Sequence, residues 1–229
     1  MKIVALSDTH TQHRQIKEVP NGDVLIFAGD LMNCGTDEID IVSFANWFMN
    51  QPHKYKILVA GNHDRLFEKY EGFCVDFFTQ YYSKNFHYLH DSGITIEGVK
   101  FWGSPYQPEF CNWAFNVERG EAIRLHWNKI PNNTDVLITH GPAYGVLDQM
   151  NTPGSKYFTE GHLGCKDLLE AVERTKPKVH IFGHIHGGYG SYKSDESVGL
   201  FLPTDSYNAS ICNEAYKPVN EPHVIELNK

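Results

Sequence analysis

The sequence lacks the features that mark secreted and membrane-bound proteins. Its five cysteines form no close pair and no Cys-x-x-Cys motif, so we predict a reduced chain located in the cytoplasm. The apolar stretch of the N-terminal segment "MKIVALSD" is too short for a signal peptide or a membrane span. Repeats, charge blocks, low-complexity segments and linkers are also absent. We therefore predict one domain that covers residues 1–229.

Positive charge is scarce as well. The chain has 20 Lys and Arg residues against 28 Asp and Glu residues, which gives a net charge of −8. Proteins that bind long nucleic acids are usually basic, so neither long nucleic acid nor a membrane is expected as a partner. A small phosphate substrate is compatible with this charge, because a bound metal ion supplies positive charge locally. The composition predicts no particular oligomeric state.

What the chain does contain is a set of short apolar runs with the length of β-strands. Each run is nearly continuous in aliphatic and aromatic residues, as expected for strands covered on both faces of a sheet. The runs occur in "KIVALSDTH", "DVLIFAGD", "KILVAGNHD", "DVLITHGP" and "KVHIFGHIH". Helical patterns over 36–50, 117–130 and 165–175 lie between some of them. Strands that alternate with helices predict an α/β fold.

Further short strands are predicted in the middle and at the end of the chain. They lie in "FHYLHDSGITIEGVKFWGS", "GLFLPTDSYNASICNEAY" and "PHVIEL", the first of which contains Asp-Ser-Gly and Glu-Gly turn signals. We expect these segments to form antiparallel pairs in a second sheet. The predicted architecture is therefore two sheets packed together, with helices on the outside.

Every one of the five apolar runs ends in oxygen or imidazole donors. These residues are Asp8, His10, Asp30, Asn62, His63, Asp64, His140, His184 and His186. Ligands of open α/β sheets bind outside the carboxyl ends of the strands, so we expect these side chains to meet in one crevice. The mixture of donors suits Mn, Fe, Zn or Ni better than Ca or Mg alone. The donors are too many for one ion, which indicates a dinuclear site with metals about 3.5–4 Å apart.

Each motif taken alone has an ordinary structural interpretation. An Asp-x-His or Gly-Asp pair after a strand is often just the start of a loop, and "GNHD" is compatible with a turn that has Asn in a left-handed conformation. "GHIH" is more specific, because the alternation of side chains along a strand places both imidazoles on one side. The metal site is predicted from the five motifs together, whereas His180, earlier in the same run, is expected to be a packed core histidine.

The ordered set "DTH", "GD", "GNHD", "TH" and "GHIH" resembles the calcineurin-like metallophosphoesterase superfamily. Longer segments are similar to its MPPED (239FB-like) branch over nearly the whole chain. They are "WGSPYQPEFCNWAFNVERG", "LITHGPAYGVLD", "GHLGCKDLLEAVERTKPKVHIFGHIHGGYG" and "YNASICNEAYKPVNEPHVIEL". The resemblance implies a metallophosphoesterase-type α/β/β/α sandwich, in which two mixed sheets are flanked by helices.

The resemblance also implies which residues hold which metal. It gives Asp8, His10 and His186 to the first metal, Asp30 to both metals as a bridge, and Asn62, His140 and His184 to the second metal. Some animal members of the branch carry Gly where His184 stands, which weakens their second site. Because the histidine is present here, we expect two full sites. Mn²⁺ is the expected metal, with Fe, Zn, Ni and Mg as alternatives.

These residues predict hydrolysis by a metal-bridging hydroxide. Two cations lower the pKa of a water held between them, and the metals and Asn62 neutralise charge on the phosphate oxygens. His63 is predicted to protonate the leaving alkoxide as a general acid. Asp64 is predicted to orient the His63 ring and to support its cationic form, as the third member of a catalytic triad does.

The substrate class is predicted less directly. "GDLMNCG" lacks the Gly-Asp-x-x-Asp-Arg-Gly pattern of protein Ser/Thr phosphatases. The MPPED branch implies a small phosphodiester, namely a 3′,5′- or 2′,3′-cyclic nucleotide. A phosphomonoesterase of broad specificity is the alternative, and a non-catalytic interaction scaffold of the same fold is disfavoured because no predicted ligand is missing.

Candidate substrate residues lie near the strand ends. Tyr106, Tyr144 and Asn208 are predicted to line the pocket. The first two lie in aromatic loops over 104–115 and 141–158, which also hold Phe110, Trp113 and Tyr157. An aromatic ring in such a loop either stacks on a nucleobase or belongs to a minor core under the loop.

Overall fold

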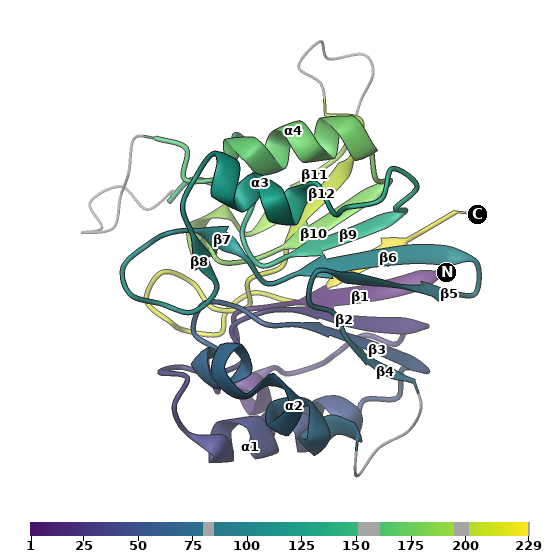
Figure 1. The fold of residues 1–229 in the computed structure, drawn as a ribbon. Helices are drawn as coiled ribbons and strands as arrows, with labels where there is room; N and C mark the ends of the chain where they lie inside the picture. Colours follow the sequence, from purple (N-terminus) through teal and green to yellow (C-terminus); the bar gives the residue numbers. More distant parts are fainter. Residues whose placement is uncertain (80–84, 151–160, 195–201, 229) are drawn as a thin grey trace.

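A computed structural model describes residues 1–79, 85–150, 161–194 and 202–228. Two β-sheets pack face to face, and helices cover the outer face of each sheet (Figure 1). This α/β/β/α arrangement confirms the predicted fold class. Among the described residues, none of the helices has the length and apolar composition needed to cross a membrane.

The first sheet has the strand order β13-β1-β2-β3-β4. Its strands are β1 (Lys2–Leu6), β2 (Val24–Ala28), β3 (Tyr55–Val59), β4 (Phe86–Tyr88) and β13 (His223–Glu226). The strands β1 to β4 are parallel to one another, and β13 runs antiparallel to β1 at the edge. The carboxyl ends of β1, β2 and β3 therefore lie along the same side of this sheet.

The second sheet has the order β11-β12-β10-β9-β6-β5. Its strands are β5 (Ser92–Ile96), β6 (Val99–Ser104), β9 (Val136–Thr139), β10 (Val179–Phe182), β11 (Gly190–Tyr192) and β12 (Asp205–Asn208). The inner four are parallel, whereas β5 and β11 are antiparallel edge strands. A separate small pair joins β7 (Gln107–Pro108) to β8 (Asn116–Val117).

The expectation that all the additional strands lie in the second sheet is wrong for β4 and β13. Helix α2 (Arg65–Thr79) precedes β4, which pairs in parallel with β3. The last strand, β13, pairs with β1. Short strands carry little information about distant partners, so local pattern does not determine their sheet. The predicted hairpin is confirmed, because β5 and β6 pair across the Glu97–Gly98 turn, where both residues have positive φ.

Four α-helices cover the two sheets in the described part of the chain. The helices α1 (Glu38–Met49) and α2 lie over the first sheet, and α3 (Glu121–Trp127) and α4 (Lys166–Thr175) lie over the second (Figure 1). Two short 3₁₀ turns, η1 (His13–Gln15) and η2 (His186–Gly188), complete the set. Helix α3 is shorter than predicted, because residues 116–117 pair as β8 before the helix begins after Gly120.

Alternating side chains on the inner strands form two cores. In β2, Leu25 and Phe27 pack towards α1 and α2, whereas Ile26 faces the second sheet. The layer between the sheets is largely aliphatic, with Ile57 and Ile138 among its fully buried members. Burial of this kind stabilises a fold by about 25 cal/mol for each Å² of apolar surface. The sheets are thereby fixed relative to each other, and so are the loops at their ends.

Candidate metal centre

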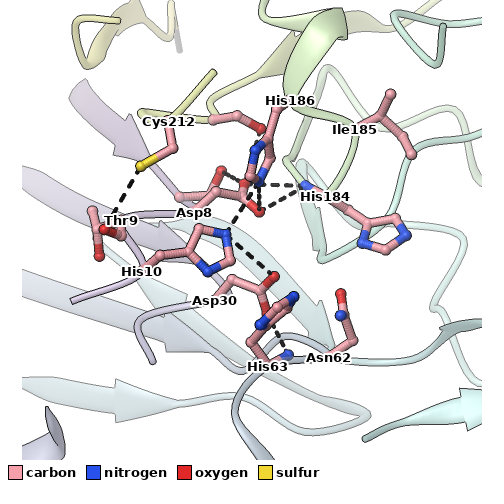
Figure 2. Close-up of polar contacts among 12 residues, drawn as sticks. Asp8, Thr9, His10, Asp30, Asn62, His63, His184, Ile185, His186 and Cys212 are labelled. Atoms are coloured by element: carbon pink, nitrogen blue, oxygen red, sulfur yellow. Dashed lines mark hydrogen bonds and ion pairs between the residues drawn. The ribbon is translucent and has the colours of Figure 1, made fainter. Parts of the chain in front are cut away.

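The predicted metal ligands lie in loops that directly follow parallel strands. Asp8 and His10 follow β1, Asp30 follows β2, Asn62 follows β3, His140 follows β9, and His184 and His186 follow β10. Figure 2 shows that these loops bring side chains from both sheets to one place. The sequence-based expectation of a common crevice at the strand ends is thus met by the geometry.

Three overlapping groups of donors lie close enough to hold metal ions. They are Asp8 with His10 and His186, His10 with Asp30 and His63, and Asp30 with His140 and His184. Within each group the donor atoms lie within 4.8 Å of one another. The first and third groups correspond to the two predicted metal positions. The sequence predicts His63 as an acid and not as a ligand, yet its ring nitrogen lies among these donors.

The imidazole rings are oriented by backbone carbonyls. His10, His140 and His186 each donate Nδ1–H to a carbonyl oxygen, at 3.2, 2.9 and 3.0 Å; the acceptors belong to Met32, Ala28 and Asn213. In the neutral form of each ring this leaves Nε2 with a lone pair, the form in which histidine binds a metal. The Nε2 atoms of His10 and His186 face each other at 3.2 Å. Two lone pairs aimed at one another fit a cation between them.

Asp30 lies between the two predicted metal positions. Its Oδ2 is 3.8 Å from Nε2 of His10 and 3.4 Å from Nε2 of His140. The carboxylate is buried, which alone raises its pKa, but the neighbouring His140 and His63 bring the pKa well below its usual range. An ionised carboxylate that lies close to His10 of the first predicted position and to His140 of the second has the position required of a bridging ligand.

Asp8 joins the end of β1 to the end of β10. Its fully buried carboxylate accepts hydrogen bonds from Oγ of Ser210 at 2.9 Å and from the backbone N–H of His184 at 3.0 Å. Gly183 precedes His184, and a Cβ added there would collide with the Asp8 carboxylate and with Ser7. The glycine before the two histidines therefore allows the backbone of one sheet to approach a ligand of the other.

The proton affinities of the histidines differ. Burial lowers the pKa of His184 to about 3 and that of His10 to about 4. Burial acts in the same direction on His140, but the charge of Asp30 outweighs it and raises the pKa of His140 to about 9. His10 and His184 are thus neutral at neutral pH, whereas His140 has to release a proton when a cation binds.

The ligand loops carry unusual backbone conformations. Asp8, His10, Asp30 and His184 all have positive φ, with values of 51°, 41°, 60° and 68°. Left-handed backbone is uncommon for residues other than glycine and costs of the order of 1–3 kcal/mol where the surroundings impose it. Such strain gathers at functional sites, because the fold holds side chains in positions that an unconstrained loop would avoid.

His63 sits at the edge of the metal centre. Its Nδ1–H donates to the carbonyl of Asn33, and its ring stacks on Trp113 with the centroids 4.0 Å apart. Nε2 is therefore the ring nitrogen left for a reaction. This arrangement is compatible with the predicted general acid.

The role predicted for Asp64 is wrong in one respect, since its carboxylate does not orient the His63 ring. Both oxygens accept backbone N–H groups from different loops; the donors, at 2.9, 2.9 and 2.8 Å, belong to Asp30, Met32 and Gly61. Burial, followed by the charge of Asp30, raises the pKa of Asp64 to about 7. The side chains of His63 and Asp64 point apart in the tight "GNHD" turn. Asp64 therefore positions the loop of Asp30 and not the His63 ring.

A cavity of about 440 Å³ opens beside the donors. Asp30, Asn62, His63, His184 and His186 line its metal end. Its walls are mostly apolar and include Phe110 and Trp113, which the sequence places in a candidate loop. Sequence reasoning misses the wall residues Arg119, Glu214 and Tyr216, because the segments that contain them give them no role and they reach the cavity only through folding.

The three predicted substrate residues do not line this cavity. The hydroxyl of Tyr106 is hydrogen bonded to Nε2 of His90 at 3.0 Å, and its ring packs against His126 with centroids 3.6 Å apart. The interpretation as a minor core under the loop is therefore correct for Tyr106. Tyr144 packs beside His162 and under the ammonium group of Lys166.

Asn208 has a structural role instead of a substrate role. It is fully buried, and its amide donates to the carbonyls of Ile185 at 2.8 Å and Leu147 at 3.2 Å while its oxygen accepts from Ser210. It thus fixes the backbone between His184 and His186. His180 is a buried core residue as predicted, with its Nε2 against Thr139. Tyr157 lies outside the described residues.

Comparison with known proteins agrees with the geometry. The model of the family "Calcineurin-like phosphoesterase" matches residues 1–188, a range that contains every predicted metal ligand. The chain belongs to this family. A calcineurin-like phosphoesterase is a hydrolase of phosphate esters, and the family uses divalent metals, for which the three donor groups are candidate sites.

Relatives of this calcineurin-like phosphoesterase cover nearly its whole length. It is 39% identical over 247 residues to "Metallophosphoesterase domain-containing protein 1" of Homo sapiens. The aligned region covers 99% of this chain and 71% of the human protein. It is 38% identical over 245 residues to UPF0046 protein K07C11.7 of Caenorhabditis elegans. This aligned region covers 100% of this chain and 76% of the nematode protein. These similarities confirm the predicted MPPED-like branch.

A solved structure supports the fold. TT1561 of Thermus thermophilus has a TM-score of 0.60 with 14% identity, over 90% of this chain and 88% of that one. At this identity the similarity concerns the fold alone.

Proposed function

We propose that this chain is a phosphodiesterase that hydrolyses small phosphodiesters, in particular cyclic nucleotides, with two divalent cations of which Mn²⁺ is the proposed species. The observation that carries the proposal is the pair of donor groups, Asp8/His10/His186 and Asp30/His140/His184, that lie beside a single cavity of about 440 Å³, with Asp30 close to both His10 and His140. Cavities of about 300–1,000 Å³ take small molecules, so the proposed partner is a nucleotide-sized phosphodiester and not a long nucleic acid.

The donor set fits two cations. Asp8, His10 and His186 would hold the first, Asn62, His140 and His184 the second, and Asp30 both. Bound cations supply positive charge for the phosphate oxygens and lower the pKa of water. The complete donor set disfavours the scaffold alternative. A cytoplasmic location is part of the proposal and is supported by the cysteines, all five of which are free thiols.

His63 is proposed to supply the proton for the leaving alkoxide. The Asn33 carbonyl holds its Nδ1–H, and the stacked Trp113 ring restricts rotation of the imidazole. Nε2 is therefore the nitrogen from which the ring would donate a proton, and His63 lines the cavity. Proton transfer by a positioned side chain contributes about 10²–10⁴-fold to the rate.

The proposal is tested with metal-free protein to which Mn²⁺ is added back. Substrates are bis-p-nitrophenyl phosphate, p-nitrophenyl phosphate, and 3′,5′- and 2′,3′-cyclic nucleotides, and metal content is measured on the same samples. Metal-free protein should be inactive, and Mn²⁺ should restore hydrolysis of the diesters. Full turnover by protein verified as metal-free would contradict the metal requirement. A preference for the monoester over every diester would contradict the diesterase assignment and favour the phosphomonoesterase alternative.

A further inference from the structure

Glu214 is an unexplained charged residue in the wall of the substrate cavity. It lines the cavity, and both of its carboxylate oxygens are shielded from solvent. Among the described residues, neither oxygen has a hydrogen-bond partner. A shielded polar group without a partner is unfavourable, and more so when the group is charged. Such a group in a functional cavity calls for an explanation other than stability.

The backbone holds Glu214 next to the first donor group. The preceding residue, Asn213, accepts Nδ1–H of His186 on its carbonyl at 3.0 Å. Its side-chain oxygen accepts the backbone N–H groups of Ala215 and Lys217, both at 3.0 Å, and closes the loop. The ring of Tyr216 lies 5.2 Å from that of His186. Glu214 is therefore fixed beside the reaction site and is not part of a free surface loop.

The other charged residues of the cavity do not neutralise Glu214. Arg119 is exposed, and its guanidinium donates to the carbonyls of Gly164 and Leu163, both at 2.9 Å. Glu109 is also exposed, so water screens its charge. No ion pair involving Glu214 exists within the described ranges 1–79, 85–150, 161–194 and 202–228. Because its charge is neither paired nor solvated, its field acts on the contents of the cavity.

We propose that Glu214 is a charge filter that favours singly charged phosphodiesters over doubly charged phosphomonoesters. The proposal rests on the diesterase function proposed above. A phosphodiester carries one negative charge, whereas a monoester carries about −1.5 to −2 at neutral pH. Water converts a diester into a monoester and an alcohol, so the repulsion from Glu214 increases as product forms. The same carboxylate therefore weakens the binding of monoester substrates and promotes release of the monoester product.

The test compares Glu214→Gln, which keeps the shape and removes the charge, with Glu221→Gln as a matched control, because Glu221 is an exposed residue that does not line the cavity. Methyl p-nitrophenyl phosphate and p-nitrophenyl phosphate share a leaving group and differ by one charge. In Glu214→Gln the ratio of kcat/KM for the monoester to that for the diester should rise roughly three- to tenfold, and inorganic phosphate should inhibit more tightly by a similar factor. The control variant should leave both quantities near the wild-type values.

Two results would overturn the charge filter. One is an unchanged substrate ratio together with unchanged phosphate inhibition in Glu214→Gln. The other is a loss of bound metal in this variant, which would show that the carboxylate helps to hold the cations instead. A wild-type preference for monoesters would count against the proposed diesterase function, yet the shift between wild type and Glu214→Gln would still decide the role of Glu214. The two ideas therefore fail through different measurements.

Discussion

The metal centre and the cavity beside it are built in different ways. The side chains of the centre follow strands of two packed sheets, and most of them are buried. The cavity walls come from connecting segments, and Phe110 in one of them is 58% exposed. The strand ends hold chemistry that depends on fixed geometry, whereas the loops are free to define what enters. Changes in the centre should therefore abolish the reaction, and changes in the walls should redistribute activity among substrates.

The largest effect is expected from Asp30→Ala. Because Asp30 lies beside His10 of the first predicted metal position and His140 of the second, its loss should remove more than one equivalent of metal and abolish hydrolysis of every substrate. Metal analysis and assays with bis-p-nitrophenyl phosphate check both parts. A variant that still binds two metals would show that another residue forms the bridge.

His63→Ala tests the border between centre and wall. Loss of the acid should slow the hydrolysis of substrates with poor leaving groups by about 10²–10⁴-fold. The rate should fall less for p-nitrophenyl esters, because p-nitrophenolate leaves with less need of protonation. Both metals should remain bound. Equal losses for good and poor leaving groups would refute the acid role, and a fall in metal content would assign His63 to the ligands, as its place beside His10 and Asp30 also allows.

His184→Gly should weaken only one part of the centre. The first donor group does not contain His184, so one metal should stay tightly bound while the affinity for the second falls by at least about tenfold. Turnover should drop and recover partly when Mn²⁺ is added. Two metals bound as in the wild type at low metal concentration would rule out His184 as a ligand.

The smallest effects are expected in the loops, where Phe110→Ala and Tyr106→Ala form a contrasting pair. Phe110 lines the cavity, where its ring would stack on a nucleobase with a free energy of about 1–3 kcal/mol. Its loss should raise KM for a cyclic nucleotide with little change in Tm. Tyr106 instead packs on His126 and bonds to His90, so its loss should lower Tm and leave KM nearly unchanged. A raised KM in Tyr106→Ala at unchanged Tm would reverse this distinction.

The sequence predicts the parts of the molecule that local pattern determines. Apolar runs that end in donors locate β1, β2, β3, β9 and β10. The rule that ligands lie at strand ends is enough to bring Asp8 and His140 together from the sequence alone. Helix α2 is not predicted, because Gly72 and several aromatic residues obscure its pattern and its backbone is kinked at Tyr70.

Features that depend on distant segments are not predictable in the same way. The sequence pairs Asp64 with its neighbour His63, although its carboxylate accepts backbone N–H groups from the loop after β2 and from Gly61 of its own turn. Glu214 has no role assigned to it by the segment that contains it, and it is held at the cavity by the contact of Asn213 with His186. The positive φ at Asp30 and His184 is likewise imposed by the assembled site, since neither residue prefers that conformation on its own.

Each of the two predicted metal positions draws its ligands from both sheets. Asp8 and His10 of the first sheet face His186 of the second, and Asp30 faces His140 and His184 across the same boundary. Each cation would therefore be a cross-link between the two halves of the sandwich. A ligand that binds only the folded chain at one hundred times its Kd adds about 2.7 kcal/mol to the free energy of unfolding. Metal supply would thus set the resistance of this protein to heat and proteolysis as well as its rate of hydrolysis.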